Sequence, residues 1–346
     1  MTTIQPNYPA ANLGNLYING GRLVYGTTTT FTVMDGQFRD ITNTGDIVLY
    51  TGTSGSGYPP GSGTTVSIST ASNVNITNPP GNINCLDKGT VAASSIYYVY
   101  AISSSLFGAN AGQDENAGQG IGTIVDAPNA NTGAPTTING PNGSVINNGV
   151  IANPSYPPTY LPAGILISLS STGPAMPMGY DMFRRIGAIR TTAGSVIEPF
   201  IQTGFGQNRT MRYQTPVAPG AGGPGATGSS ATYATIGALL AVVPQISVDV
   251  LVNCALSAGT AGNCLFLTAA NGTSTPPAIT LSYSKMSSLV GAGATLFQEA
   301  QLICPCALNN AATPVMEIDY CTQTYAGVGT SNDNIAFTIA GYIDAL

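Results

Sequence analysis

The clearest structural signal in the chain is the segment Ile246-Ser247-Val248-Asp249-Val250-Leu251-Val252-Asn253-Cys254. Its even-numbered positions are all apolar, and its odd-numbered positions are mostly polar. This period of two is typical of a β-strand with one buried face and one solvated face. The same alternation recurs at residues 335–343, 316–320 and 279–283, so the sequence predicts antiparallel sheet in the C-terminal part of the chain.

The N-terminal part carries shorter strand signals. Residues 16–18 and 22–25 flank Asn19-Gly20-Gly21, which is typical of the turn of a β-hairpin. Residues 31–33 and 46–50 continue the strand pattern. We therefore expect a hairpin near the start of the chain.

Helical periodicity is scarce. It is confined to residues 289–302, where Gly291 and Gly293 weaken it because glycine is a poor helix former. The sequence therefore predicts an all-β fold, with one short helix at most.

Composition divides the chain into regions. The segment PVAPGAGGPGATGSS at residues 216–230 has no large apolar residue beyond Val217, which is typical of a linker. The segment at residues 108–164 is rich in Gly, Asn, Ala and Pro and is longer than loops of compact domains usually are. We interpret it as an insertion that lies along a partner subunit, and a disordered excursion is the alternative.

These boundaries predict four regions. They are an N-terminal β-hairpin and assembly region (1–80), a β-domain carrying the insertion (81–215), the Gly/Pro linker (216–230) and a C-terminal antiparallel, jelly-roll-like β-sandwich (231–346).

Charge and composition exclude several classes of function. The chain has 9 Lys+Arg and 15 Asp+Glu, a net charge of −6, and is 7% charged, against about 25% in ordinary soluble domains. The absence of His excludes Ser-His-Asp and Cys-His catalysis and His-based metal sites. The acidic balance argues against nucleic-acid binding, which needs a basic surface. We expect no cofactor.

The sequence predicts neither a signal peptide nor a membrane span. The N-terminal MTTIQPN has neither a cationic start nor an apolar run, so it does not resemble a signal peptide. The most apolar stretch, residues 236–243, is too short to span a bilayer, which takes about 20 residues. We expect synthesis in the cytoplasm without membrane insertion.

The six cysteines form no CxxC pair. They are Cys85, Cys254, Cys264, Cys304, Cys306 and Cys321. Burial as small apolar core residues is the favoured interpretation, since free cysteine is among the most buried residue types. A disulfide between Cys254 and Cys264 across a hairpin is the alternative.

Carboxylate pairs are the remaining catalytic option, because a glycosidase uses two carboxylates across a cleft. Glu317 and Asp319 share a strand face, while Asp114, Glu115 and Asp126 offer oxygens for Ca²⁺ without EF-hand spacing. Solvated surface is the favoured interpretation of both groups, so we assign no catalytic or metal residues and expect no enzyme.

Candidate interface residues come from the scarce arginines and the 17 tyrosines. Arg184 and Arg185 point to opposite faces if they lie on a strand. Tyrosine suits interfaces because it joins an apolar ring to a polar tip. The candidate interface residues are Arg39, Asp40, Tyr98, Tyr100, Tyr180, Arg184 and Arg185.

Three stretches resemble a family of tailed-phage and prophage structural proteins, often labelled tail-fibre or minor virion structural proteins. They are DGQFRDITNT (35–44) running into residues 46–49, LDKGTVA (86–92) followed by YYVYAI (97–102), and Leu169-Ser170 through Gly179-Tyr180 to RRIGAI (184–189). Residues 200–204 fit the strand that usually follows, and residues 340–344 resemble a chain ending of the family. The likeness covers about residues 13–213, and the insertion at 108–164 departs from it.

The resemblance implies a β-rich, oligomeric component on the outside of a virion, with no catalytic residues. We therefore expect a non-enzymatic bacteriophage structural protein, such as a tail fibre or spike, a head fibre or a capsid decoration protein. Its expected partners are copies of itself, with a trimer as the expected oligomer, and other virion proteins. The alternative is a host-attachment protein that binds a host-surface glycan through C-terminal loops carrying Asn271, Thr273, Tyr325 and Asn332.

Overall fold

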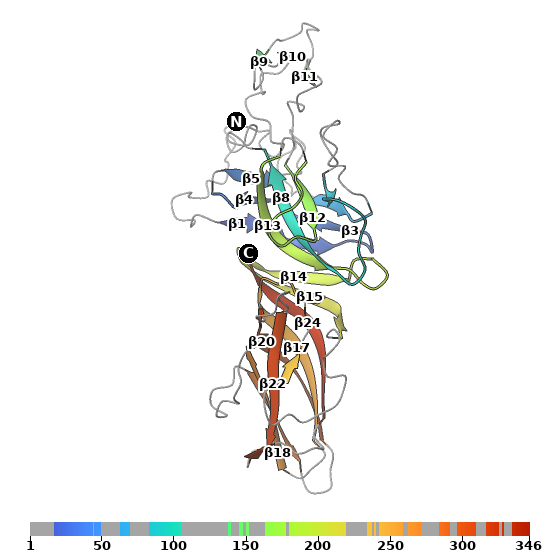
Figure 1. Ribbon diagram of the computed structural model, residues 1–346, viewed down its shortest axis with the longest axis vertical. Helices are drawn as coiled ribbons and strands as arrows, with labels where there is room; N and C mark the ends of the chain where they lie inside the picture. Colours follow the sequence, from blue (N-terminus) through green and yellow to red (C-terminus); the bar gives the residue numbers. More distant parts are fainter. Residues whose placement is uncertain are drawn as a thin grey trace, which may run out of the picture.

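The fold is all-β, as expected, and no α-helix occurs in the residues that the computed structural model describes. Those residues are 17–43, 45–49, 63–69, 83–104, 138–139, 145–147, 150–151, 163–177, 180–218, 234–236, 239, 242–258, 262–270, 284–290, 296–308, 316–324, 327–328 and 334–346. The molecule is elongated, with strands β1–β13 at one end, strands β16–β24 at the other, and β14 and β15 between them (Figure 1). We call these ends the N-terminal part and the C-terminal part.

An eight-stranded antiparallel sheet runs through both parts. Its order is β20 (Leu296–Pro305), β17 (Ser247–Ala258), β24 (Asn334–Ala345), β15 (Asn208–Val217), β14 (Phe200–Phe205), β2 (Leu23–Tyr25), β3 (Thr30–Val33) and β6 (Thr64–Ser67). Within this sheet, the two parts are joined by the pairing of β15 with β24.

The N-terminal part adds two further sheets. The four-stranded sheet has the order β13 (Met182–Arg190), β8 (Ile96–Ser103), β12 (Gly164–Ser168) and β7 (Cys85–Leu86), of which β12 and β7 are parallel. The three-stranded sheet has the order β1 (Ile18–Gly20), β4 (Gly36–Arg39) and β5 (Asp46–Leu49). All eight residues of β8 are buried, which explains why its sequence IYYVYAIS is apolar without alternation.

The C-terminal part adds a six-stranded sheet. It consists of β16 (Ala234–Ile236), β22 (Met316–Thr324), β18 (Gly262–Ala270), β19 (Ser284–Val290), β21 (Ala307–Leu308) and β23 (Gly327–Val328). Strands β18 and β19 contact β20 of the eight-stranded sheet. The finer expectation of a jelly-roll-like sandwich at 231–346 stays a prediction.

Within the segment 108–164, the structure describes a small antiparallel sheet. It has the order β11 (Val150–Ile151), β10 (Val145–Asn147) and β9 (Ile138–Asn139). The docking of this segment on a partner subunit stays a prediction.

The predicted strands at 246–254, 316–320 and 335–343 are confirmed as parts of β17, β22 and β24, except that β17 begins one residue later, at Ser247. The strand predicted at 279–283 lies outside the described residues. The short helix allowed at residues 289–302 was wrong, because β19 ends at Val290 and β20 begins at Leu296.

The N-terminal hairpin was also wrong. Strand β1 pairs with β4, whereas β2 pairs with β3 and β14, so Gly20 and Gly21 carry the chain from one sheet to another. Both glycines have positive φ, 75° and 67°, which explains why the segment looks like a hairpin turn. A side chain at Gly21 would collide with the ring of Phe38, which is fully buried on β4.

Strand pairing crosses the region expected to be a linker. Pro216 and Val217 belong to β15, and residues 219–230 lie outside the described chain. Since β15 pairs with β24, the regions on either side of 216–230 share one sheet. Their buried apolar residues also form one cluster, which extends from Ile18 to Tyr342.

Candidate functional site

A row of buried polar residues lies where the two parts meet. Arg209 on β15 is the cross-strand neighbour of Asp344 on β24, which is in turn the neighbour of Ser247 on β17. All three are buried, and Ser247 Oγ donates a hydrogen bond of 3.0 Å to Asp344 Oδ1. We call these three residues, together with Arg185 on β13, the joint.

Arg209 connects the joint to the corner between β1 and β2. Its guanidinium donates to the carbonyl oxygens of Gly20, Gly21 (2.7 Å) and Gly206 (3.1 Å). It also lies 3.4 Å from Oε1 of Gln202, which accepts a 2.7 Å bond from the backbone N–H of Leu23. One side chain therefore satisfies the carbonyls that the sheet-changing corner leaves unpaired.

Tyrosines attach the four-stranded sheet to the C-terminal part. The Tyr342 hydroxyl on β24 donates to the carbonyl oxygen of Ala188 on β13 at 2.9 Å. The Tyr98 hydroxyl on β8 accepts a bond of 3.2 Å from the backbone N–H of Gln245, just before β17. Tyr213 packs edge-on against Tyr342, with ring centroids 6.2 Å apart. These contacts place the joint inside the molecule, between two sheets.

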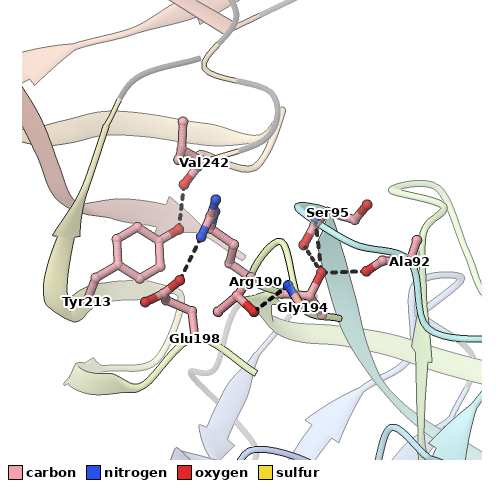
Figure 2. A network of polar contacts seen from close by, with 9 residues as sticks. Ala92, Ser95, Arg190, Gly194, Glu198, Tyr213 and Val242 are labelled. Carbon is pink, nitrogen blue, oxygen red and sulfur yellow. Dashed lines mark hydrogen bonds and ion pairs between the residues drawn. The ribbon is translucent and has the colours of Figure 1, made fainter. Parts of the chain in front are cut away.

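A second polar network lies beside this boundary (Figure 2). Arg190 Nη1 on β13 lies 2.7 Å from Glu198 Oε2, with both side chains largely buried. Beside this ion pair, the Tyr213 hydroxyl donates to the carbonyl oxygen of Val242. The hydroxyl of Thr191 donates to the Ala92 carbonyl at 2.7 Å and so ties the end of β13 to the segment before β8.

Burial controls the electrostatics of the joint. It raises the pKa of Asp344, and the charge of Arg185, the hydrogen bond from Ser247 and the charge of Arg209 oppose that rise. Burial lowers the pKa of Arg209 to about 10, against the opposing effect of Asp344. The pKa of Arg185 is also lowered by burial, and Asp344 is the strongest opposing charge. The joint is therefore a set of coupled charges removed from solvent.

The structure buries most of the candidate interface residues inside the chain. Asp40, Tyr98, Tyr100, Tyr180 and Arg184 expose 5% or less of their surface. An intersubunit contact requires exposed side chains, so these five contribute to the packing of their own chain. Arginines and acids also find partners within the same chain, as in the ion pairs Arg190–Glu198 and Arg39–Asp46.

Arg39 and Asp40 illustrate this pairing. Arg39 Nε lies 3.0 Å from Asp46 Oδ1, and its guanidinium carbon lies 5.6 Å from the ring centre of Tyr17. Asp40 accepts bonds from the backbone N–H groups of Thr42 (3.0 Å) and Gly45 (2.7 Å), so it closes the loop between β4 and β5.

Arg184 and Arg185 feel the charges of different acids. The charge of Asp40 acts on Arg184, whereas the charge of Asp344 acts on Arg185. This agrees with the expectation that adjacent strand residues point to opposite faces. Tyr100, on the strand beside β13, donates from its hydroxyl to the Ser170 carbonyl at 2.7 Å.

The other candidates are only partly placed. The loop residues Asn271, Thr273, Tyr325 and Asn332 lie outside the described residues, as do Asp114, Glu115 and Asp126. Glu317 and Asp319 lie two residues apart on β22, and their backbones therefore put them on one strand face.

The described cysteines behave as core residues. Cys85, Cys254 and Cys304 are buried, Cys306 is half-buried, and none of these four forms a disulfide. The disulfide considered between Cys254 and Cys264 was wrong, because β17 and β18 belong to different sheets and Cys254 is free.

Sequence reasoning missed Arg209, Asp344, Ser247 and Gln202. The alternation of apolar and polar residues along the strands did contain a signal for the two charged residues. Arg209 shares its strand face with Met211 and Tyr213, and Asp344 shares its face with Tyr342. A charge on the apolar face of a strand indicates a buried polar contact.

No protein-family model, curated protein or solved structure matches the chain. In the described part of the chain, no helix is long and apolar enough to cross a membrane. The same residues contain no group of three or more His, Cys, Asp or Glu side chains that could hold a metal ion.

Proposed function

We propose that this chain is a non-enzymatic structural protein of a bacteriophage virion, which assembles into symmetric oligomers on the outside of the particle. The proposal takes its virion context from the resemblance of residues 13–213 to tail-fibre and minor virion proteins. Tail fibre or spike, head fibre and capsid decoration are the candidate locations, and a trimer is the expected oligomer.

The observation that carries the proposal is the outer face of the eight-stranded sheet beside the joint. We define this outer face as Val24, Ile201, Thr203, Thr210 and Arg212. The register pairs Ile201 with both Val24 and Arg212, and Thr203 with Thr210, so the side chains lie on one surface. Ile201 is 55% exposed, and Arg212 is the one charged member.

Such a face favours packing against another copy of the chain. Burying hydroxyls and aliphatic groups costs less desolvation free energy than burying charges does. Closed symmetry presents the same face to every neighbour and can cover sheet edges as well. A surface with few charges therefore suits repeated contacts between identical subunits.

Sedimentation of the full chain at micromolar concentration tests the oligomer. We expect a closed oligomer whose dissociation constant rises at least tenfold in Ile201→Glu, because the contact would have to remove a new carboxylate as well as its cross-strand neighbour Arg212 from water. Ile41→Glu is the matched control, since Ile41 is 48% exposed and lies outside the eight-stranded sheet. A monomer at all concentrations, with no association on particles, would contradict the proposal.

The virion location needs a separate experiment. Antibody labelling of purified particles, imaged by electron microscopy, should decorate the exterior at symmetric positions. Unlabelled particles combined with binding of the chain to host envelope preparations would instead favour the glycan-binding alternative.

A further inference from the structure

Two patches of opposite charge lie on the eight-stranded sheet, on either side of β24. The first belongs to the outer face defined above and consists of exposed Ile201 and Arg212, which are cross-strand neighbours on β14 and β15. We call it the basic patch. The second lies on β17 and β20, where half-exposed Asp249 is two residues from Leu251, the cross-strand neighbour of exposed Ile303. We call Asp249 and Ile303 the acidic patch.

The register puts both patches on one surface. Arg212 is the cross-strand neighbour of Gly341, which is in turn the neighbour of Leu251. Cross-strand neighbours share a face, and so do residues two apart on one strand. Arg212 and Asp249 therefore project from the same side of the sheet. Two strand spacings and two residues separate them, which is about 12 Å between their backbones.

Each patch combines exposed aliphatic groups with one charge that its own chain leaves solvated. In the part of the chain that the structure describes, the side chains of Arg212 and Asp249 make no hydrogen bond or ion pair. Ile201 is 55% exposed and Ile303 is 54% exposed. Val248, next to Asp249, is 45% exposed and extends the acidic patch. The two patches thus resemble each other in apolar character and differ in the sign of their charge.

We propose that the acidic patch of one chain docks on the basic patch of a second copy, with Asp249 of one copy against Arg212 of the next. This inference rests on the proposed function, because it names the surface that the outer face meets in the oligomer. The two patches are different surfaces, so the contact is head-to-tail. Repeating a head-to-tail contact closes a ring when the rotation between copies allows it, and the expected trimer is one such ring.

Charge complementarity selects the acidic patch as the occupant of the basic patch. Two basic patches in contact would bring two Arg212 side chains together, whereas the acidic patch supplies an opposite charge at the same place. The isoleucines around the pair exclude water only when two copies meet. In the separate chain both charged side chains are solvated, so changing either one acts on association and leaves the unfolding of the monomer nearly unchanged.

Sedimentation equilibrium of full-length charge-reversal variants tests the contact. Arg212→Glu and Asp249→Arg should each raise the dissociation constant by at least about tenfold, because each places like charges opposite one another. The double variant Arg212→Glu/Asp249→Arg should return it to within about threefold of the wild-type value, because opposite charges face each other again. Lys88→Glu and Asp181→Arg, at exposed charges outside the eight-stranded sheet, are the matched controls and should leave it unchanged.

A second pair of variants keeps the test decisive if a reversal variant does not fold. Arg212→Gln and Asp249→Asn each remove the same contact, so the neutral double variant should associate little more weakly than either single variant. Single reversals without effect, a double reversal as weak as the single ones, or additive effects of the neutral variants would each overturn this contact while the proposed oligomer stands. A wild-type chain that stays monomeric would contradict the proposed oligomer itself, and the contact with it.

Discussion

Arg209 and Arg212 lie three residues apart on β15 and occupy opposite environments. Arg209 is 4% exposed and donates to backbone carbonyls of the β1–β2 corner, whereas Arg212 is exposed on the outer face beside Ile201. The inner face of the sheet thus contains the charges of the joint, and its outer face contains mostly Thr, Val and Ile. Arginine thus donates to backbone carbonyls on the inner face of β15 and is solvated on its outer face.

The largest expected effect comes from removing the inner arginine. Arg209→Met should lower the free energy of unfolding by about 3–5 kcal/mol, because Asp344 loses a buried charge partner and several carbonyls lose their donor. Arg212→Met, on the opposite face of the same strand, should change it by less than about 0.5 kcal/mol. Urea denaturation of both variants measures the contrast, and equal losses would remove the distinction between the faces.

Gly341 tests how closely β24 and β15 approach. Its φ is 156°, and a Cβ there would lie far inside 3.0 Å of the Met211 carbonyl oxygen, a separation that real Cβ contacts essentially never show. Gly341→Ala should therefore destabilise the chain by about 1–3 kcal/mol. Gly194→Ala is the control, since its nearest neighbour would be 3.6 Å away. Thermal unfolding measures the midpoints of both variants. Equal midpoints would argue against a tight contact between β15 and β24.

A smaller effect is expected at the tyrosine that bridges the sheets. Tyr342→Phe removes the hydrogen bond to the Ala188 carbonyl and should cost about 1 kcal/mol in urea denaturation. The comparison is Tyr25→Phe, whose half-buried ring packs edge-on against Phe200 and would keep that packing. If both substitutions are neutral, the Tyr342 hydroxyl contributes nothing to the connection between the sheets.

Thiol reactivity tests the same contrast between buried and exposed faces of the sheet, and it does so without altering the free energy of unfolding. Burial raises the pKa of Cys254 to about 12, so at about pH 8 very little reactive thiolate is present in the folded chain. Alkylation of Cys254, followed peptide by peptide with mass spectrometry, should be slow in buffer and fast in urea. Equal rates in both solvents would show that the inner face of β17 is open to solvent.

Local periodicity was sufficient to predict the strands but not their partners. The alternation at residues 246–254 predicts β17 because side chains on a strand alternate between faces. Nothing within that segment specifies that β24 and β20 flank β17, since these pairings join residues far apart in the chain. The hairpin predicted at Asn19-Gly20-Gly21 was wrong for the same reason. The turn is local, whereas the pairing of β1 with β4 is not.

The candidate site was predictable only in part. Scarcity of charge drew attention to Arg184 and Arg185 but suggested exposed contacts, because a sequence does not show which surfaces are covered. Arg209 and Asp344 could have been found from their positions on apolar strand faces. That they meet across β15 and β24 depends on a pairing between residues more than a hundred positions apart in the sequence.

The position of β24 has a consequence for biosynthesis. Among the described strands it is made last, yet it lies in the middle of the eight-stranded sheet, between β15 and β17. On the ribosome, the edges of β15 and β17 that will pair with β24 remain unpaired until β24 has been synthesised. Open strand edges promote aggregation, so the nascent chain should depend on chaperones or on slow translation during that interval.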